Sequence, residues 1–230
     1  YALRSNQNII PTAVNNTMTL SSGGLILTGG TINPTGAITA GVVSPMTLNF
    51  GAAGAGEALI YVGTATSTIQ AQINAAQGLT KMGPNQLTIQ SINPGVGAPV
   101  VINEGTVLAR VPVSGTGTAV SGVFNNQDII LNGGSLLIPS NLANAAGTAS
   151  EIASNINVTG TLGGNVFVRA DATIGNNSLT QYTRIGNLTV ANAAGSPAMD
   201  GNGVIALGLA AGIWVTGTTT LSPQARINAT

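Results

Sequence analysis

Short hydrophobic runs of three to five residues recur along the chain, separated by clusters of Gly, Pro, Asn and Ser. Proline fixes one backbone angle and Gly or Asn accepts positive φ, so each cluster can end a run and turn the chain. The pattern therefore predicts short β-strands joined by tight turns. It is clearest over residues 78–109, where strands are expected at Leu87–Ile89, Val100–Ile102 and Thr106–Leu108 and corners at residues 83–85, 93–95 and 103–105.

The same pattern predicts strands along the rest of the chain. They are expected at residues 18–20, 25–27, 37–39, 46–50, 58–62, 68–73, 129–138, 165–169, 178–182, 187–190, 204–209, 213–216, 216–221 and 225–228. Helical periodicity is almost missing. The best candidate, Ala143–Ile152, is weakened by Gly147 and is predicted to be a loop with at most one helical turn.

An apolar residue followed by Asn recurs at a nearly constant spacing. Ile73, Ile102 and Leu131 are separated by 29 residues each, and Val158 follows after 27 more. A period of 27–29 residues that holds three short strands predicts one coil of a single-stranded parallel β-helix, or solenoid. The leading alternative is a β-sandwich or jelly roll, which also uses many short strands. Residues 1–16 are expected to be an irregular N-terminal segment and a candidate contact to a neighbouring subunit, and residues 17–230 the solenoid domain.

Residues 78–109 resemble the autotransporter-associated β-strand repeat of large bacterial surface and secreted proteins. That repeat runs roughly Gly-Leu-Thr-Lys-x-Gly-x-Gly-x-Leu-x-Leu, a turn, and Val-x-x-Gly-Thr-Leu; here Pro84–Asn85 departs from it. The resemblance implies a parallel β-solenoid of a cell-surface or extracellular protein. The matching residues are Gly78, Leu79, Thr80, Lys81, Gly83, Leu87, Ile89, Ile102, Gly105, Thr106 and Leu108.

Composition argues against some classes of function. Charged residues are 5% of the chain and aromatic residues 3%, with net charge zero, no Cys and no His. No basic stripe exists to neutralise phosphates, so nucleic-acid binding is not expected. The longest apolar run, Val204–Val215, is too short to span a bilayer as a helix. Any signal segment is expected to be absent from this sequence, and the end in mid-pattern predicts a piece of, or a subunit in, something longer.

Candidate chemistry is sparse. Glu104 and Asp128, 24 residues apart, could be aligned by stacked coils as a glycosidase pair, and Arg169 and Asp171 could serve a lyase. Each pair also reads as exposed turn or surface residues, which is the interpretation we prefer. The turn at Asp200 carries part of a calcium-loop pattern but lacks the rest of it. We therefore predict no catalytic, cofactor-binding or metal site.

Weaker patterns have structural explanations. Trp214 could stack on a sugar but lies inside an apolar run, so it is expected in the core. Threonine pairs with one residue between them are unevenly spaced and reflect Thr-rich strands rather than one ice-binding ladder. Five Asn-x-Ser/Thr sequons, at Asn15, Asn157, Asn176, Asn187 and Asn228, are expected by chance in a chain so rich in Asn and Thr.

Three functions follow from these patterns. The preferred one is a non-catalytic structural module of a bacterial extracellular fibre, filament or adhesin that associates with itself or with neighbouring repeats. The second is a β-helix module that binds a carbohydrate or a surface through Asn, Thr and Gln. The third, a polysaccharide lyase or glycosidase, is disfavoured because the commonest catalytic residue types are missing.

Overall fold

The computed structural model describes residues 2–13, 15–33, 44–109, 123–125 and 127–140, and beyond them only strands, the last of which ends at residue 229. Side chains are described as far as residue 137. Every described strand pair is parallel. The expected all-β fold with parallel strands is thus confirmed. The alternative of an antiparallel sandwich or jelly roll is wrong for these strands.

The strands form two long and two short sheets. Sheet A contains β1 (Leu3–Ser5), β3 (Gly24–Leu27), β6 (Ala58–Val62), β9 (Leu79–Met82), β12 (Val100–Ile102), β14 (Ile129–Leu131), β17 (Ile156–Val158), β20 (Leu188–Val190) and β23 (Thr219–Leu221). Sheet B contains β4 (Thr31–Ile32), β7 (Ser67–Ile69), β10 (Gln86–Ile89), β13 (Thr106–Ala109), β15 (Ser135–Ser140), β18 (Gly164–Ala170), β21 (Gly203–Leu207) and β24 (Arg226–Ala229).

Sheet C contains β2 (Thr17–Leu20), β5 (Thr47–Phe50), β8 (Gln72–Ala75) and β11 (Gly95–Val96), and sheet D contains β16 (Ser150–Ile152), β19 (Gln181–Ile185) and β22 (Ala211–Val215). In the described part of the chain the one helix is η1 (Ala52–Gly54), a single 3₁₀ turn. No helix in that part is long and apolar enough to cross a bilayer.

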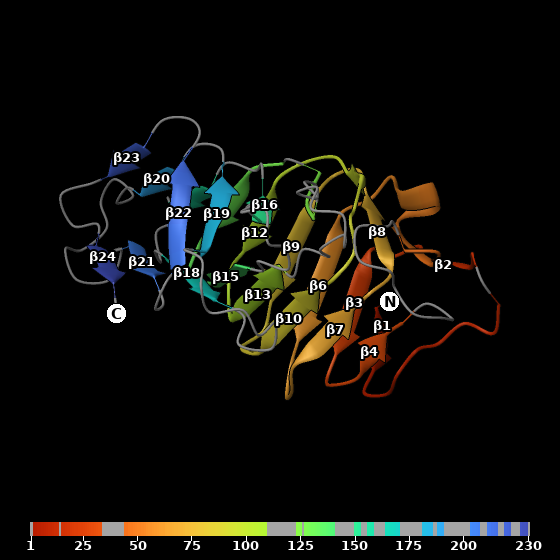
Figure 1. Cartoon of the computed structure of the whole chain (residues 1–230). Helices are drawn as coiled ribbons and strands as arrows, with labels where there is room; N and C mark the ends of the chain where they lie inside the picture. The colour runs from red at the N-terminus through yellow and green to blue at the C-terminus, as the bar shows by residue number, and fades with distance from the viewer. Residues whose placement is uncertain are drawn as a thin grey trace.

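The chain visits the sheets in a constant order. From β2 to β13 it passes from sheet C to sheet A to sheet B and back, and from β16 onward sheet D takes the place of sheet C. We call one such circuit of the sheets a pass. Each strand pairs with the strand that the preceding pass placed in the same sheet. The strands therefore progress along an elongated stack, from β1–β4 at one side to β21–β24 at the other (Figure 1). This arrangement is compatible with a parallel β-helix.

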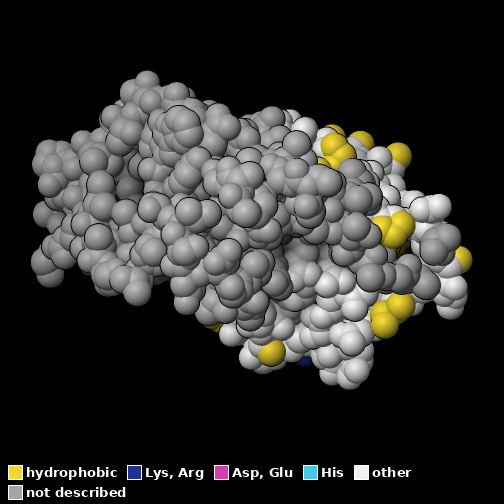
Figure 2. Space-filling model, viewed as in Figure 1, with side chains coloured by type: hydrophobic (Ala, Val, Ile, Leu, Met, Phe, Trp, Pro, Cys, Tyr) yellow, Lys and Arg dark blue, Asp and Glu magenta, His cyan; other side chains and the backbone are white. Residues whose placement is uncertain are grey.

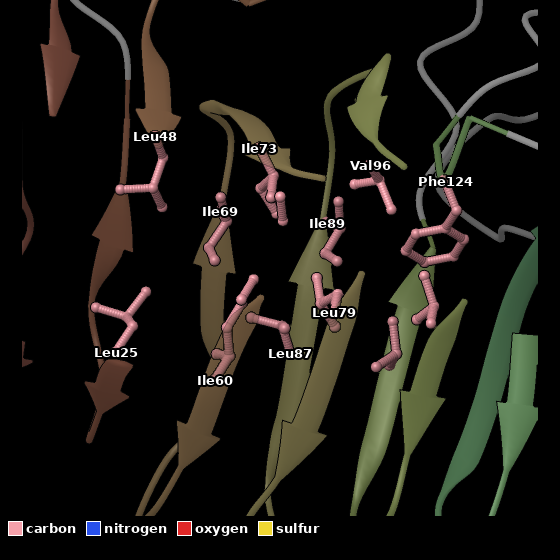
Figure 3. Packing of buried hydrophobic residues seen from close by; sticks show 14 of the residues in the cluster. Leu25, Leu48, Ile60, Ile69, Ile73, Leu79, Leu87, Ile89, Val96 and Phe124 are labelled. Atoms are coloured by element: carbon pink, nitrogen blue, oxygen red, sulfur yellow. The ribbon is translucent and has the colours of Figure 1, made fainter. Parts of the chain in front are cut away.

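Alternation along most strands whose side chains are described builds the core. In β6, Ala58, Ile60 and Val62 are buried whereas Leu59 and Tyr61 point outward. Buried aliphatic side chains from sheets A, B and C meet in the interior (Figure 3). Full burial of one such side chain is worth about 1.5–3 kcal/mol, so a core of small side chains gains its stability from their number. Among the described buried residues, aromatic rings come only from Phe50 and Phe124.

The 29-residue repeat is confirmed in one place and wrong in another. Ile102 pairs with Leu131, as the repeat predicts. Ile73, however, pairs with Leu48 in sheet C. On the preceding strand of sheet A, the register partner of Ile102 is Lys81, 21 positions earlier in the sequence. The spacing is uneven because the connections differ in length: two residues separate β7 from β8, and 14 separate β4 from β5. Strand register survives these differences, since insertions fall between the strands.

The N-terminal segment contributes to the stack. Leu3–Ser5, expected to be irregular, forms β1 and pairs with β3 of the same chain. Ile9 makes a parallel bridge with Ile32, and the side-chain oxygen of Asn8 accepts a 2.9 Å hydrogen bond from the Thr31 amide. Alternation explains β1, because Leu3 packs against the core while Arg4 remains exposed.

Most other predicted strands are present with shifts of a few residues. The run 68–73 is two strands, β7 and β8, and the sequence patterns do not predict the strands β4, β9, β11 and β17. Residues 150–152, predicted to be part of a loop, form β16, whereas residues 143–149 and the strand predicted at 37–39 lie outside the described residues. The strand β9 escaped prediction because a lysine interrupts its hydrophobic pattern.

Candidate functional site

Lys81, the single lysine of the chain, lies inside the stack. It is fully buried in β9, and its register partners on the neighbouring strands β6 and β12 are Ile60 and Ile102. Its Nζ donates hydrogen bonds of 2.6 Å to the carbonyl oxygen of Gly83 and of 2.9 Å to that of Glu104. The aliphatic stem thus replaces a core side chain, while the amine joins two successive corners between sheets A and B.

Burial controls the charge of this amine. Removal from water lowers the pKa of Lys81 from 10.5 to about 8, and the negative charge of Glu104 opposes that shift. The ammonium form is held by carbonyl dipoles and by this nearby carboxylate. Lys81 is therefore a buried basic group that releases its proton under mildly alkaline conditions.

The two carboxylates considered as a glycosidase pair are not brought together. Glu104 follows the end of β12, and its Oε2 accepts a 3.1 Å hydrogen bond from the Gly83 amide. Asp128 precedes β14, and its main-chain oxygen accepts a hydrogen bond from Val100 at the start of β12. A strand length thus separates them. The contacts of Glu104 instead join the corner at residues 103–105 to the corner at residues 83–85. We call these two corners, which Lys81 also joins, the Lys81 corner.

The remaining candidates have scattered positions. Arg169 lies in β18 and Trp214 in β22, both among the strands whose side chains are not described. Asp171 and Asp200 lie outside the described residues. Thr17 and Thr19 are exposed on β2, the end strand of sheet C.

Carboxamide side chains are stacked between neighbouring passes of the chain. The Asn74 amide donates a 3.0 Å hydrogen bond to Asn49, and the Asn132 amide donates one of the same length to Asn103. Such ladders satisfy polar groups along a stack of strands and fix their register. They supply a structural use for the abundant Asn.

A second polar cluster lies in the interior near sheet C. The Asn93 side chain is fully buried; its Oδ1 accepts hydrogen bonds from the Ile73 amide at 2.7 Å and from the Ser91 hydroxyl at 2.9 Å. Its Nδ2 donates to the carbonyl oxygens of Ser91, at 2.9 Å, and Val123, at 2.7 Å. The carboxamide therefore makes both hydrogen bonds that its nitrogen can donate and both that its oxygen can accept, and these bonds join three passes of the chain.

We expect Asn93→Asp to lower the free energy of unfolding by about 2–4 kcal/mol near neutral pH, because a buried carboxylate replaces two donated hydrogen bonds. Chemical denaturation of both proteins measures the loss. Exposed Asn6→Asp is the matched control and is expected to change stability by less than about 0.5 kcal/mol. Equal stability of Asn93→Asp and the wild type would contradict the buried network.

The outer face of sheet A carries exposed hydrophobic side chains. Leu59 is 38% exposed and Tyr61 40% exposed, both on β6. Ile26 and Met82, the register partners of Tyr61 on the strands to either side, are half-buried. We call these four residues the Tyr61 strip. On the face shown in Figure 2 the described surface is mostly neutral and polar, with hydrophobic side chains in separate small groups.

The sequence patterns predict neither the buried Lys81 nor the Tyr61 strip. The sequence patterns include Lys81 only in the repeat-like motif, although a single lysine at a position that alternation assigns to the core signals an unusual environment. Tyr61 falls in a predicted strand to which the sequence assigns no role, although alternation over residues 58–62 already puts Leu59 and Tyr61 on the face opposite the core.

Within the described residues, no three His, Cys, Asp or Glu side chains gather where they could hold a metal ion. No family model matches the chain, and neither does any curated protein or solved structure.

Proposed function

We propose that the parallel sheets form a single-stranded β-helix and that this chain is a non-catalytic structural module of a bacterial extracellular fibre, filament or adhesin. The observation that carries the proposal is the constant order in which the chain visits its sheets, with every described strand pair parallel. A structure built by repeating one pass can be lengthened by adding passes, and each pass needs contacts only with its neighbours.

The end strands support association along the stack. At the N-terminal side β1 and β2 are each the last strand of a sheet, whereas the outer edge of β4 already bonds Asn8 and Ile9 of the same chain. An end strand presents unpaired amides and carbonyls to which a further parallel strand can be added. Ile10, which is 57% exposed, and the partly buried Leu3, Ile9 and Met18 place apolar surface at the same side. The added strands would come from a second copy or from more of the same chain.

The chemistry of the chain agrees with this role. The described buried polar groups of Lys81 and Asn93 are used to join passes of the chain. The resemblance of residues 78–109 to the autotransporter-associated repeat, and its implied location at the cell surface, support the same proposal. We propose accordingly that Glu104 serves structure rather than catalysis.

We expect Thr19→Pro to weaken self-association by at least about tenfold. The oxygens of Asn16 and Leu20 accept hydrogen bonds from the β5 side, so in a parallel ladder the Thr19 amide faces the open edge of β2. Proline removes that donor and leaves the pairing with β5 intact. Sedimentation velocity over a range of concentrations measures the change, and electron microscopy shows whether the larger species are filaments.

Thr19→Val is the matched control, because it changes the same side chain and keeps the amide. It is expected to associate like the wild type. A wild-type chain that stays monomeric at about 1 mM would contradict self-association. Association that is equally strong in the proline variant would exclude the β2 edge as the contact.

A further inference from the structure

The Tyr61 strip crosses three adjacent strands of sheet A. Ile26, Tyr61 and Met82 occupy one register position on β3, β6 and β9, and Leu59 lies two residues before Tyr61 on the same face. Neighbouring parallel strands are ~4.8 Å apart, so the three aligned side chains form a row along the stack. The row places an aromatic ring between two aliphatic side chains on a regular, shallow surface.

The size of the strip argues against a second copy as its occupant. Two of its side chains are about two-fifths exposed and the other two less. Val101 and Ile130, half-buried on β12 and β14, continue the row of Leu59 and Thr80 on the same face. A stable protein–protein interface needs ~800 Å² from each partner, well beyond what these six partly exposed side chains offer. A narrow ligand that covers a few side chains in a row fits the available surface.

Polar groups that together carry no net charge border the strip. Beside Leu59, its register partner Thr80 donates a 2.5 Å hydrogen bond to Glu57 Oε1. Beyond Met82 in the same row, the carboxamides of Asn103 and Asn132 are joined by a hydrogen bond that uses one polar atom of each. At the other end of the row, Arg4 of β1 is the exposed register partner of Ile26, so the border carries one basic and one acidic side chain and no net charge. A lipid surface or an anionic ligand would favour a cluster of basic residues here. Amides, a hydroxyl, one guanidinium and one carboxylate around apolar side chains suit a neutral ligand rich in hydroxyl groups.

We propose that the Tyr61 strip and its polar border bind a neutral oligosaccharide of equatorially linked pyranose rings lying along the stack. Such rings present flat C–H faces to an aromatic or aliphatic surface and hydroxyl groups at their edges. An extended chain of them advances per ring by a distance close to the ~4.8 Å between neighbouring strands, so successive rings meet successive strands. This binding role goes beyond the structural role proposed above, and Tyr61 is its central contact.

Titration of the full chain with cellohexaose and chitohexaose, followed by NMR chemical shifts and calorimetry, tests the site. At least one of the two is expected to bind saturably with a Kd of about 1 mM or lower. Tyr61→Ala is expected to weaken that binding by about tenfold or more, whereas Tyr61→Phe, which keeps the ring, is expected to stay within about threefold. Maltohexaose, a curved α-linked chain of the same length, is the ligand control.

Thr66→Ala is the matched protein control, because it truncates an exposed side chain on the connection between β6 and β7, outside the strip and its polar border. Unfolding midpoints establish that each variant is folded. No saturable binding of either β-linked hexasaccharide at about 10 mM would overturn the proposal. Equal binding of maltohexaose, undiminished binding by folded Tyr61→Ala, or a dimer that this substitution dissociates would overturn it as well. None of these outcomes bears on association through β2, which is tested by Thr19→Pro.

Discussion

Gly83→Ala is expected to lower the free energy of unfolding by about 2–4 kcal/mol. Gly83 has φ of 84°, a left-handed conformation that residues with a Cβ rarely adopt. A Cβ at this position would lie 2.4 Å from the main-chain oxygen of Val62, on the preceding pass. The same residue accepts the hydrogen bond from Lys81 and donates one to Glu104. Any movement that relieves the clash therefore disturbs the Lys81 corner as well.

Urea denaturation of Gly83→Ala beside Gly63→Ala provides the test. A Cβ at Gly63 would lie 3.3 Å from side-chain atoms of Thr28 and Tyr61, which can shift, so this control is expected to cost less than about 1 kcal/mol. Equal costs for the two substitutions would contradict the close approach of passes at the Gly83 corner.

The wild-type protein is expected to become more stable as the pH rises from about 7.5 to about 9.5, by roughly 2 kcal/mol. The pKa of Lys81 is about 8 in the folded protein and 10.5 without burial. Between these values the unfolded chain still binds the proton that the folded protein has released. Stability therefore rises with pH across this window, and the complete shift is equivalent to about 3 kcal/mol.

Lys81→Met is the control for this prediction, because it keeps an unbranched apolar stem and removes the titrating group. With no His, no Cys and no second Lys in the chain, few other side chains titrate in the window. Denaturant midpoints measured for both proteins at several pH values give the difference. A difference between wild type and Lys81→Met that is independent of pH would contradict a buried amine at this position.

Local patterns were sufficient to predict most of the strands and their parallel pairing. Runs such as residues 58–62 carry a buried–exposed alternation within the sequence itself, and the shortage of aromatic residues is matched by a core of Leu, Ile and Val. The pairing of Ile102 with Leu131 also follows from a local motif, an apolar residue followed by Asn and Gly.

The contacts between passes could not be predicted in this way. The partners of Lys81 lie on two corners, one two residues away and the other 23 residues away. The spacing between paired strands changes because connections differ in length, so a fixed period aligned Ile73 with the wrong strand. The burial of Asn93 likewise depends on Ile73 and Val123, on the passes before and after it. Residue type alone identifies none of these partners.

Cross-linking of introduced cysteines tests the parallel stack most directly, since the chain has no native Cys. Val101 and Ile130 are register partners on the outer face of the adjacent strands β12 and β14, whereas Leu59 lies two strands from Val101. Adjacent strands are ~4.8 Å apart and a disulfide needs Cα atoms within ~7 Å. A parallel stack predicts that Val101→Cys with Ile130→Cys forms an intramolecular disulfide while Val101→Cys with Leu59→Cys does not. Failure of the first pair in folded protein, or equal cross-linking of both, would contradict it.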